Sequence, residues 1–468
     1  MDGQSNGLIS AGRDVAEILK EKYPDKEVYF VGGMVRNYLM EKAIKDVDVA
    51  GNIHPSLVAE LFPGSTVTEK LGTVFIRREG GDVEYTPYRV EGDYNGRHPG
   101  EVKFSQDVRE DMKRRDFTIN ALYMNPFTLE VLDLVGGLGD IRNKVLRCVG
   151  DPVERFQEDY LRILRAIRFS VQFGLEIDPA TLSALHEKKE HLSRLSGFRL
   201  REELLKGVGV PGYVRRSCEL GVMEQVIPEV ADMRGVDQKT VHHKYDVLEH
   251  SLRSLEYAVD HHKGRAPEFY LAVFLHDIGK PAQYSEIRRH EHGSEGFRKT
   301  MSLYDHSLWG AKIVEHRLSK LHFSAKEIDY VSMMVRLHKN GSLYEENVNL
   351  VKDKTIKKLM AESGHHMDDL IVLAIADRYG TGTRTMEEVR EWADAFSKRV
   401  ADIEARGEPG GLKDLALNGH DVMSLGFGGR DVGLLLNALH EHVLEKPEDN
   451  TRERLIALVP EFRNKTGR

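Results

Sequence analysis

The distribution of strand-like runs along the chain constrains its fold more than any other feature. Runs rich in β-branched and aromatic residues concentrate early in the chain, at residues 28–31, 47–50, 74–76 and 83–85. From Asp151 to about Val400, apolar residues recur with helical periodicity and strand signals nearly vanish. We therefore expect an α+β multidomain chain, in which a small α/β head with a mixed or antiparallel sheet precedes all-α parts.

Glycine and proline residues divide the helical part further. The stretch 405–411, with three glycines and a proline, is the clearest linker. A length of 468 residues also exceeds what one hydrophobic core usually supports. We predict a head at residues 1–150, a helical neck at 151–235, a further helical domain at 236–400 and a helical tail at 401–468.

Composition excludes several classes of protein. A hydrophobic fraction of 40% excludes wholesale disorder, and only two cysteines, Cys148 and Cys218, exclude a disulfide scaffold or a cysteine-ligated zinc module. No apolar run is long enough to span a bilayer, and the N-terminus lacks a secretory pattern. We therefore expect a cytoplasmic protein without a membrane partner.

The charge distribution leaves room for an RNA partner. The net charge of −8 argues against a chain that coats nucleic acid through bulk positive charge. Residues 101–216, however, hold 20 lysines and arginines against 18 acidic residues, a net of +2. This segment is either a set of solvated helix faces or a surface that an anionic ligand contacts.

Two carboxylates at the start of a predicted strand form the first candidate site. Asp46 and Asp48 flank Val47, and because side chains alternate along a strand, both point to one face about 6.6 Å apart. Carboxylate oxygens suit Mg²⁺, which can clamp the reacting oxygens of an in-line phosphoryl displacement. Glu84, with Asp82 on its face, is a candidate third carboxylate.

Glycines and arginines near these acids suit a phosphate ligand. Gly32 and Gly33 follow the first strand and let backbone N–H groups approach a phosphate, while Arg36 on the following helix can donate two hydrogen bonds. Arg114 and Arg115 precede Asp116 and could bind a triphosphate. A tight turn and a basic surface loop are the alternative interpretations.

A row of charged residues in the neck offers a protein-side template. Residues 158–169 read as one helix, on which Asp159, Arg162, Arg165 and Arg168 share a face. A carboxylate accepts hydrogen bonds and a guanidinium donates them. Asp159 and Arg162 together could therefore pair with cytosine or adenine in the way that the Watson–Crick edge of a base does. Arg165 and Arg168 would then contact phosphate or sugar. The alternative is a solvated face with ion pairs.

In combination, these motifs resemble those of class II tRNA nucleotidyltransferases, the CCA-adding enzymes and their bacterial poly(A) polymerase relatives. The resembling segments, in order, are residues 31–36, 46–48, 114–121 and 158–162. The resemblance implies that Asp46 and Asp48 are catalytic and bind Mg²⁺. It implies that ATP or CTP is contacted by Gly33, Arg36, Arg115, Asp159, Arg162, Arg165 and Arg168. The expected reaction adds two CMP and one AMP to the 3′ end of tRNA.

Two details qualify the resemblance. Residues 89–99 look like the family's flexible loop, which is implicated in the switch from CTP to ATP and which enzymes that add only CC tend to lack. Asn37 stands where the family usually has aspartate.

A second candidate metal site lies in the helical domain. His276 and Asp277 follow an apolar run, His250 precedes them on another predicted helix, and Asp377 follows much later. This order resembles the HD phosphohydrolase superfamily. Imidazole and carboxylate ligands suit Mn²⁺, Ni²⁺, Fe²⁺ or Zn²⁺, and such a metal can support phosphoester hydrolysis. The candidate secondary ligands are Asp305, His306 and His338.

We therefore expect an HD-containing CCA-adding enzyme that is similar to the family over about residues 29–459, including the tail segments 415–423 and 447–453. A narrower activity, addition of A alone or poly(A) synthesis, is the near alternative. The distant alternative is an HD phosphohydrolase whose head only binds RNA. Oligomeric state, the metal of the second site and its hydrolytic activity stay open.

Overall fold

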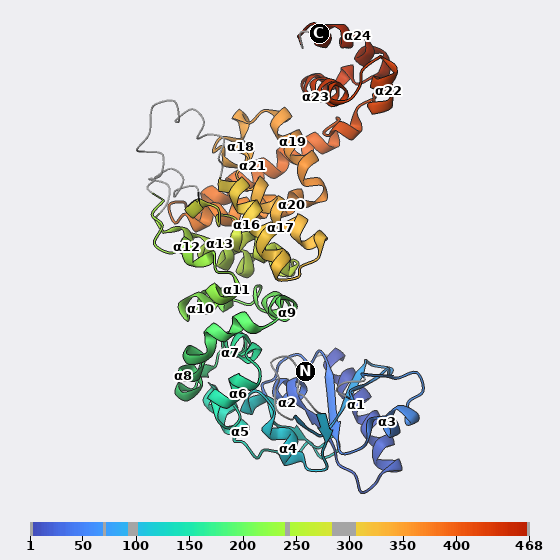
Figure 1. The fold of residues 1–468 in the computed structure, drawn as a ribbon, viewed down its shortest axis with the longest axis vertical. Helices are drawn as coiled ribbons and strands as arrows, with labels where there is room; N and C mark the ends of the chain where they lie inside the picture. The colour runs from blue at the N-terminus through green and yellow to red at the C-terminus, as the bar shows by residue number, and fades with distance from the viewer. Residues whose placement is uncertain (1–2, 69–71, 92–101, 239–243, 283–305, 466–468) are drawn as a thin grey trace. The chain divides into compact units, whose positions relative to one another are not determined.

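The computed structural model describes residues 3–68, 72–91, 102–238, 244–282 and 306–465. The chain splits into two compact units, Met1–Val226 and Ile227–Arg468, which are described separately. Figure 1 shows that strands gather in the first unit and that the second is built from helices.

A seven-stranded sheet forms the centre of the head, in the order β3-β4-β5-β2-β1-β8-β9. Its central pair, β2 and β5, is parallel, and the other neighbours are antiparallel, so the sheet is mixed, as predicted. The strands are β1 (Val28–Val31), β2 (Val47–Gly51), β3 (Thr66–Val67), β4 (Val74–Ile76), β5 (Val83–Pro87), β8 (Tyr123–Met124) and β9 (Val131–Leu132). Two-stranded pairs join β6 (Arg89–Glu91) to β7 (Val102–Phe104) and β10 (Val145–Leu146) to β11 (Glu176–Ile177).

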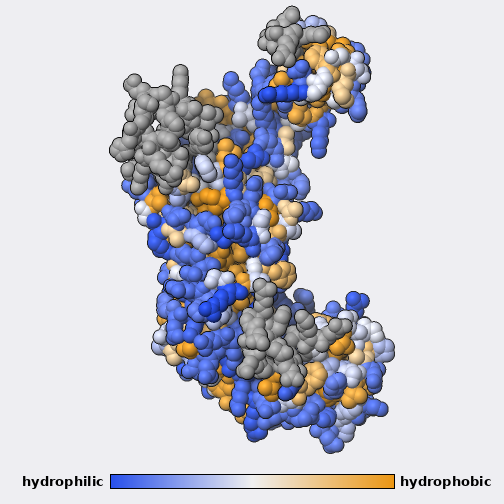
Figure 2. Space-filling view, viewed as in Figure 1, coloured by the Kyte–Doolittle hydropathy of each residue, from blue (hydrophilic) through white to orange (hydrophobic). Residues whose placement is uncertain are grey.

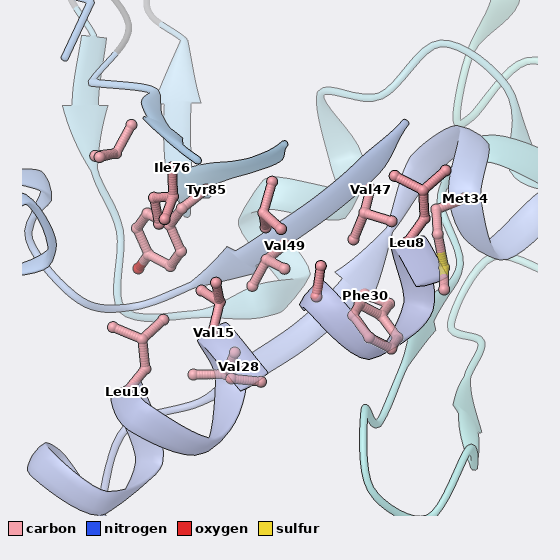
Figure 3. Packing of buried hydrophobic residues seen from close by; sticks show 14 of the residues in the cluster. Leu8, Val15, Leu19, Val28, Phe30, Met34, Val47, Val49, Ile76 and Tyr85 are labelled. Atoms are coloured by element: carbon pink, nitrogen blue, oxygen red, sulfur yellow. The ribbon is translucent and has the colours of Figure 1, made fainter. Parts of the chain in front are cut away.

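One face of this sheet is buried under helices α1 (Gly3–Lys22), α2 (Gly32–Leu39) and α3 (Pro55–Leu61). Figure 3 shows Leu19 of α1 beside Val28 of the sheet, and Leu8 of α1 beside Val47. Because side chains alternate along β2, the burial of its valines turns Asp48 to the opposite face. The hydrophobic pattern of one strand therefore places the candidate carboxylate.

The neck is helical and differs from the prediction at one point. A single helix was expected over residues 158–169, but α6 (Pro152–Glu158) ends before Asp159, whose φ of −151° and ψ of 101° are extended, and α7 (Leu161–Phe173) begins after it. The remaining helices of the first unit are α4 (Val108–Lys113), α5 (Gly137–Asn143), α8 (Pro179–Lys188), α9 (Gly197–Gly207), α10 (Tyr213–Glu219) and α11 (Met223–Val226).

Helices make up the second unit, with buried histidines and aspartates between several of them. The helices are α12 (Val230–Met233), α13 (Val247–His261), α14 (Pro267–Leu275), α16 (His306–Lys320), α17 (Ala325–Leu337), α18 (Gly341–Tyr344), α19 (Asp353–Ser363), α20 (Met367–Gly380) and α21 (Met386–Ala405). The tail helices are α22 (Gly419–Ser424), α23 (Arg430–Glu445) and α24 (Arg452–Lys465). They share a small core of their own that includes Val422, Leu439 and Leu455.

On the face drawn in Figure 2, hydrophilic side chains cover most of the described surface and hydrophobic ones form scattered patches. None of the described helices is both long enough and apolar enough to cross a bilayer.

Candidate functional site

A row of acidic residues lies on the sheet face opposite the buried valines. In the parallel pairing of β2 and β5, Asp48 is directly opposite Glu84, and Asp46 immediately precedes β2. Burial, and then the charge of Asp46, raise the pKa of Asp48 to about 6, although Arg115 and Arg36 act against this. Burial, and then the two aspartates, also raise the pKa of Glu84. A divalent cation would therefore stabilise the ionised form of these carboxylates, and a hard cation such as Mg²⁺ prefers carboxylate oxygens as ligands.

The glycine turn and one arginine of the first candidate site lie beside this row. Gly32, with a φ of +66°, begins α2, and a Cβ at this position would lie 3.1 Å from Asp48 Oδ2 and 3.6 Å from Arg115 Nη1. A side chain here would strain the backbone and fill the space between a carboxylate and a guanidinium. The structure therefore brings Gly32, Asp48 and Arg115 together at one point.

Arg36 lies buried behind the turn, in contact with aromatic rings. Its guanidinium lies 5.1 Å from the centroid of Phe169 and 4.4 Å from that of Phe173. Burial, together with Arg168 and Arg165, lowers the pKa of Arg36 to about 10, although Asp116 and Asp48 act against this. An anion bound here would relieve the repulsion among these cations.

Asn37, the residue that departs from the family pattern, holds Arg36 in place. Its Oδ1 accepts hydrogen bonds from Arg36 Nε at 3.1 Å and Nη2 at 2.9 Å, and its Nδ2 donates to the carbonyl of Ala43 at 2.9 Å. A carboxylate at this position could accept from Arg36 but could not donate to Ala43.

Asp116 connects Arg36 with the neck arginines. Its Oδ1 accepts from Asn120 Nδ2 at 3.0 Å, and Asn120 Oδ1 accepts from Arg36 Nη1 at 2.6 Å. Its Oδ2 accepts from Arg165 Nε at 2.9 Å and Nη2 at 2.6 Å. Arg168 is bonded to Glu203 at 2.6 Å, and its guanidinium lies 4.4 Å from the Phe169 centroid. A continuous hydrogen-bonded chain thus runs from Arg36 to Arg165.

The residues of the expected template pair, Asp159 and Arg162, are both hydrogen-bonded to other groups of the protein. Asp159 Oδ2 accepts from Arg199 at 2.8 Å, and its Oδ1 accepts from the backbone N–H of Leu161. Arg162 is buried and donates to Glu158 at 2.7 Å and to the carbonyls of Arg155 and Arg114, each at 2.9 Å. Arg162 thus contacts Arg114 of the head, whereas Asp159 contacts Arg199 of the neck, and the predicted role of both residues stays a prediction.

We expect Asp48→Asn to stabilise the metal-free head in a pH-dependent way. The folded-state pKa of Asp48 is raised to about 6, above its unfolded value near 4. The protonated carboxyl is therefore tolerated in the fold below pH 4, and stability is lost as the pH rises through 6 and the buried group ionises. An asparagine never ionises. The free energy of unfolding of the variant should therefore exceed that of the native chain by about 2 kcal/mol at pH 7.5, and this difference should shrink toward pH 4. Urea unfolding in EDTA at both pH values measures this, and an advantage that does not change with pH would contradict it.

A second site lies between α13, α14, α16, α17 and α20. His250 Nε2 lies 3.1 Å from His276 Nε2 and 3.0 Å from Asp377 Oδ1, and Asp277 Oδ2 lies 3.3 Å from both imidazole Nε2 atoms. All four side chains are buried. The four residues predicted from the spacing of the sequence motif therefore do come together.

Two further histidines face the other oxygen of Asp277. Its Oδ1 lies 3.2 Å from His306 Nε2 and 3.5 Å from His338 Nε2. Among the described residues, the groups whose donor atoms are close enough to hold a metal are His250, His276 and Asp377, and His276, Asp277 and His338. Asp305 lies outside the described residues, as do residues 92–99 of the expected flexible loop.

Hydrogen bonds orient the imidazoles for ligation. Nδ1 of His276 lies 2.8 Å from the carbonyl of Val273, and Nδ1 of His338 lies 2.6 Å from that of Val335. These nitrogens must donate, so each Nε2 faces the centre and can offer its lone pair to a metal when that nitrogen releases its proton. His306 differs, because its Nδ1 faces the ammonium of Lys339 at 3.3 Å. His338 is therefore better oriented as a ligand than His306.

The charge at this centre also fits a metal cation. Burial alone would lower the pKa of His276, but Asp277 and Asp377 raise it to about 10. Lys280 and His276 hold the pKa of Asp277 well below its usual value despite burial. The buried carboxylates thus favour positive charge, which a divalent metal supplies. Gly279 allows the close packing of this site, since a Cβ there would lie 2.0 Å from the carbonyl oxygen of His306.

Several residues around the head site were not singled out from sequence. Asn120, Phe169 and Asp111 carry the hydrogen bonds and ring contacts of the arginines. Asp111 had a local signal, because it lies three and four residues before Arg114 and Arg115 in the chain. The other partners depend on contacts between distant segments.

Family models match three regions of the chain. Residues 28–147 match the poly A polymerase head domain, residues 174–233 the probable RNA and SrmB-binding site of polymerase A, and residues 247–381 the HD domain. A CCA-adding enzyme of Lactobacillus helveticus is 39% identical over 211 residues, 45% of this chain and 52% of that protein. One of Enterococcus faecalis is 42% identical over 201 residues, 41% of this chain and 49% of that protein. The matched regions thus span about half the length of these curated relatives.

Solved structures share the fold over nearly the full chain. The Bacillus stearothermophilus CCA-adding enzyme in complex with CTP is 23% identical with a TM-score of 0.69, covering 100% of this chain and 99% of that one. The Thermotoga maritima CCA-adding enzyme complexed with tRNA is 19% identical with a TM-score of 0.55, covering 96% and 94%. The predicted fold class is confirmed, and so is the resemblance that the motifs indicated.

Proposed function

We propose that this chain, which combines a poly A polymerase head domain with an HD domain, is a tRNA nucleotidyltransferase that adds CCA to the 3′ end of tRNA. It would use CTP twice and ATP once, without a nucleic-acid template. The observation that carries the proposal is the convergence of Asp48, the Gly32 turn and Arg115 on the polar face of the head sheet. Curated relatives that are named CCA-adding enzymes support the choice of reaction.

The proposed reaction is an in-line displacement at the α-phosphate. The terminal ribose hydroxyl of tRNA attacks the α-phosphorus of CTP or ATP, a new phosphodiester bond forms, and pyrophosphate leaves. Asp46 and Asp48 would hold Mg²⁺, which when bound supplies charge neutralisation at the reacting oxygens. Gly33, Arg36 and Arg115 would hold the triphosphate through backbone N–H groups and guanidinium donors. Such a reaction fits a cytoplasmic protein, which the two buried cysteine thiols also support.

Nucleotide selection would depend on Asp159 and Arg162. Both already carry partners in the protein, so reading a base requires that Arg162 exchange its bond to Glu158, and Asp159 its bond to Arg199, for bonds to the base. Arg165 and Arg168, which lie on the same helix as Arg162, would contact phosphate or sugar. In the structure they are hydrogen-bonded to Asp116 and Glu203, respectively. The exchange of one partner for another would leave few buried charges unpaired at any stage.

We expect Arg162→Ala to reduce discrimination between the correct nucleotides and UTP or GTP by at least about tenfold, because a paired donor and acceptor on a base typically discriminate by 1–3 kcal/mol. Competitive incorporation from mixed triphosphates measures the ratio. Arg155→Ala is the matched control, since Arg155 is equally buried and also bonded to Glu158. Unchanged selectivity in Arg162→Ala, or an equal loss in the control, would remove the template role.

Incubation with shortened tRNAs tests the function itself. Transcripts lacking the last three, two or one nucleotides are each supplied with one labelled triphosphate. We expect CMP incorporation on the first two and AMP incorporation on the third. Incorporation of AMP alone would favour the A-adding alternative, and long AMP tracts would favour poly(A) synthesis.

A second candidate function belongs to the HD domain. The observation that favours it is the cluster of His250, His276, Asp277 and Asp377, with His338 oriented toward it. We propose that this cluster holds Mn²⁺, Ni²⁺, Fe²⁺ or Zn²⁺, since mixed nitrogen and oxygen ligands suit these ions better than Mg²⁺. The bound metal would supply Lewis acidity for hydrolysis of a phosphoester.

A further inference from the structure

Asp111 is a buried carboxylate that faces both arginines of the head site. It lies on α4 with no exposed surface, and its Oδ1 accepts from Arg114 Nε at 2.7 Å. Its Oδ2 accepts from Arg115 Nη2 at 3.1 Å and from the hydroxyl of Tyr123. Burial alone would raise the pKa of Asp111, but the two guanidinium groups lower it to about 2. Asp111 is therefore a charged anchor inside the head.

Tyr123 is the second anchor of Arg115. It lies on β8, and its hydroxyl accepts from Arg115 Nε at 2.8 Å while donating to Asp111. The Arg115 guanidinium also lies 4.9 Å from the centroid of the Tyr123 ring. A guanidinium is planar and rigid, so two fixed nitrogens determine where the third points.

The third nitrogen of Arg115 points toward the glycine turn. Nη1 lies 3.6 Å from the Cβ position of Gly32, which is itself 3.1 Å from Asp48 Oδ2. Nη1 also donates a long hydrogen bond, at 3.5 Å, to the carbonyl of Asn120. Nε and Nη2 of Arg115 thus face Tyr123 and Asp111 inside the head. Nη1, beside Asp48, points to the place where the triphosphate is proposed to bind.

We infer that Asp111 and Tyr123 are positioning residues, which fix Arg115 so that Nη1 donates to the triphosphate of the incoming nucleotide. Neither residue touches the nucleotide. The inference rests on the proposed function of the head, and it adds that nucleotide affinity is set by a buried pair behind the site. A mobile arginine would lose rotamer entropy on binding, whereas an anchored one does not.

Titration of CTP with Mg²⁺ in the absence of RNA tests this inference, because no transfer can occur. Tyr123→Phe keeps the ring and removes the hydroxyl, and we expect it to raise the dissociation constant about tenfold, as is typical for a lost hydrogen bond to a charged group. Tyr88→Phe is the matched control. Its ring packs edge-on to Tyr123 in the same cluster, and its hydroxyl has no hydrogen-bond partner among the described residues. The control should bind CTP as the native chain does.

A double-mutant cycle separates positioning from general packing. In an Arg115→Lys background, the anchored guanidinium is absent, so Tyr123→Phe should raise the dissociation constant no further. Asp111→Asn should act in the same direction in the native background and should be equally silent in Arg115→Lys. An equal fold-change in both backgrounds, or an equal effect of Tyr88→Phe, would overturn the inference while leaving the proposed function intact. A native chain that binds no CTP would overturn both.

Discussion

Replacement of Asp48 by asparagine is expected to lower CMP and AMP transfer to tRNA by about 10²- to 10³-fold, a loss of the size seen when a group that stabilises transition-state charge is removed. Asp48 lies on the polar face of the sheet beside Arg115 and opposite Glu84. An asparagine keeps the shape but not the charge that would hold Mg²⁺. Single-turnover incorporation of labelled CTP measures the loss.

Controls distinguish loss of chemistry from loss of structure. The tRNA affinity of Asp48→Asn, measured by gel shift, should stay within about twofold, because tRNA recognition by shape and phosphate contacts needs no catalytic carboxylate. Asp14→Asn makes the same chemical change at an exposed position of α1 and should transfer normally. Normal transfer by Asp48→Asn, or a comparable loss in Asp14→Asn, would contradict the assignment of the site.

Replacement of Asp277 by asparagine is expected to abolish metal binding and hydrolysis in the HD domain. Asp277 lies within 3.5 Å of four histidine Nε2 atoms, so its two oxygens reach members of both candidate ligand groups. We expect hydrolysis of bis(p-nitrophenyl) phosphate with Mn²⁺ or Ni²⁺ to fall to the rate seen without added metal. Metal analysis after dialysis should show loss of bound ion in parallel.

The control for this site is Asp260→Asn, an exposed aspartate on the helix that carries His250. It should retain metal and hydrolysis. Asp277→Asn should also retain CCA addition, and Asp48→Asn should retain phosphodiester hydrolysis, because the two sites belong to different units of the chain. Hydrolysis that survives in Asp277→Asn would exclude the HD cluster as its source.

The sequence predicted those parts of the structure that depend on local pattern. Alternation along β2 placed Asp48 on the face opposite Val47 and Val49, and the four strand runs lie where the β-rich segments indicated. The spacing of His250, His276, Asp277 and Asp377 likewise predicted residues that do meet. In each case one residue's position follows from its immediate neighbours or from a recognised motif.

The neck could not be predicted in the same way. Spacing of three placed Asp159 on a helix with Arg162, but the chain is extended at Asp159, and Arg199 is its partner from 40 residues away. Arg162 is directed by the carbonyl of Arg114, and Arg168 by Glu203. These contacts connect segments that only the tertiary fold brings together, so no local periodicity could reveal them.

The most direct test of the account is the mass of tRNA after reaction. A transcript lacking its last three nucleotides is incubated with the native chain, Mg²⁺ and all four triphosphates, and the product is measured by intact mass spectrometry. We predict a gain of two cytidylates and one adenylate and then no further growth, with no gain for Asp48→Asn. An unchanged mass for the native chain, or growth by a run of adenylates, would contradict the account.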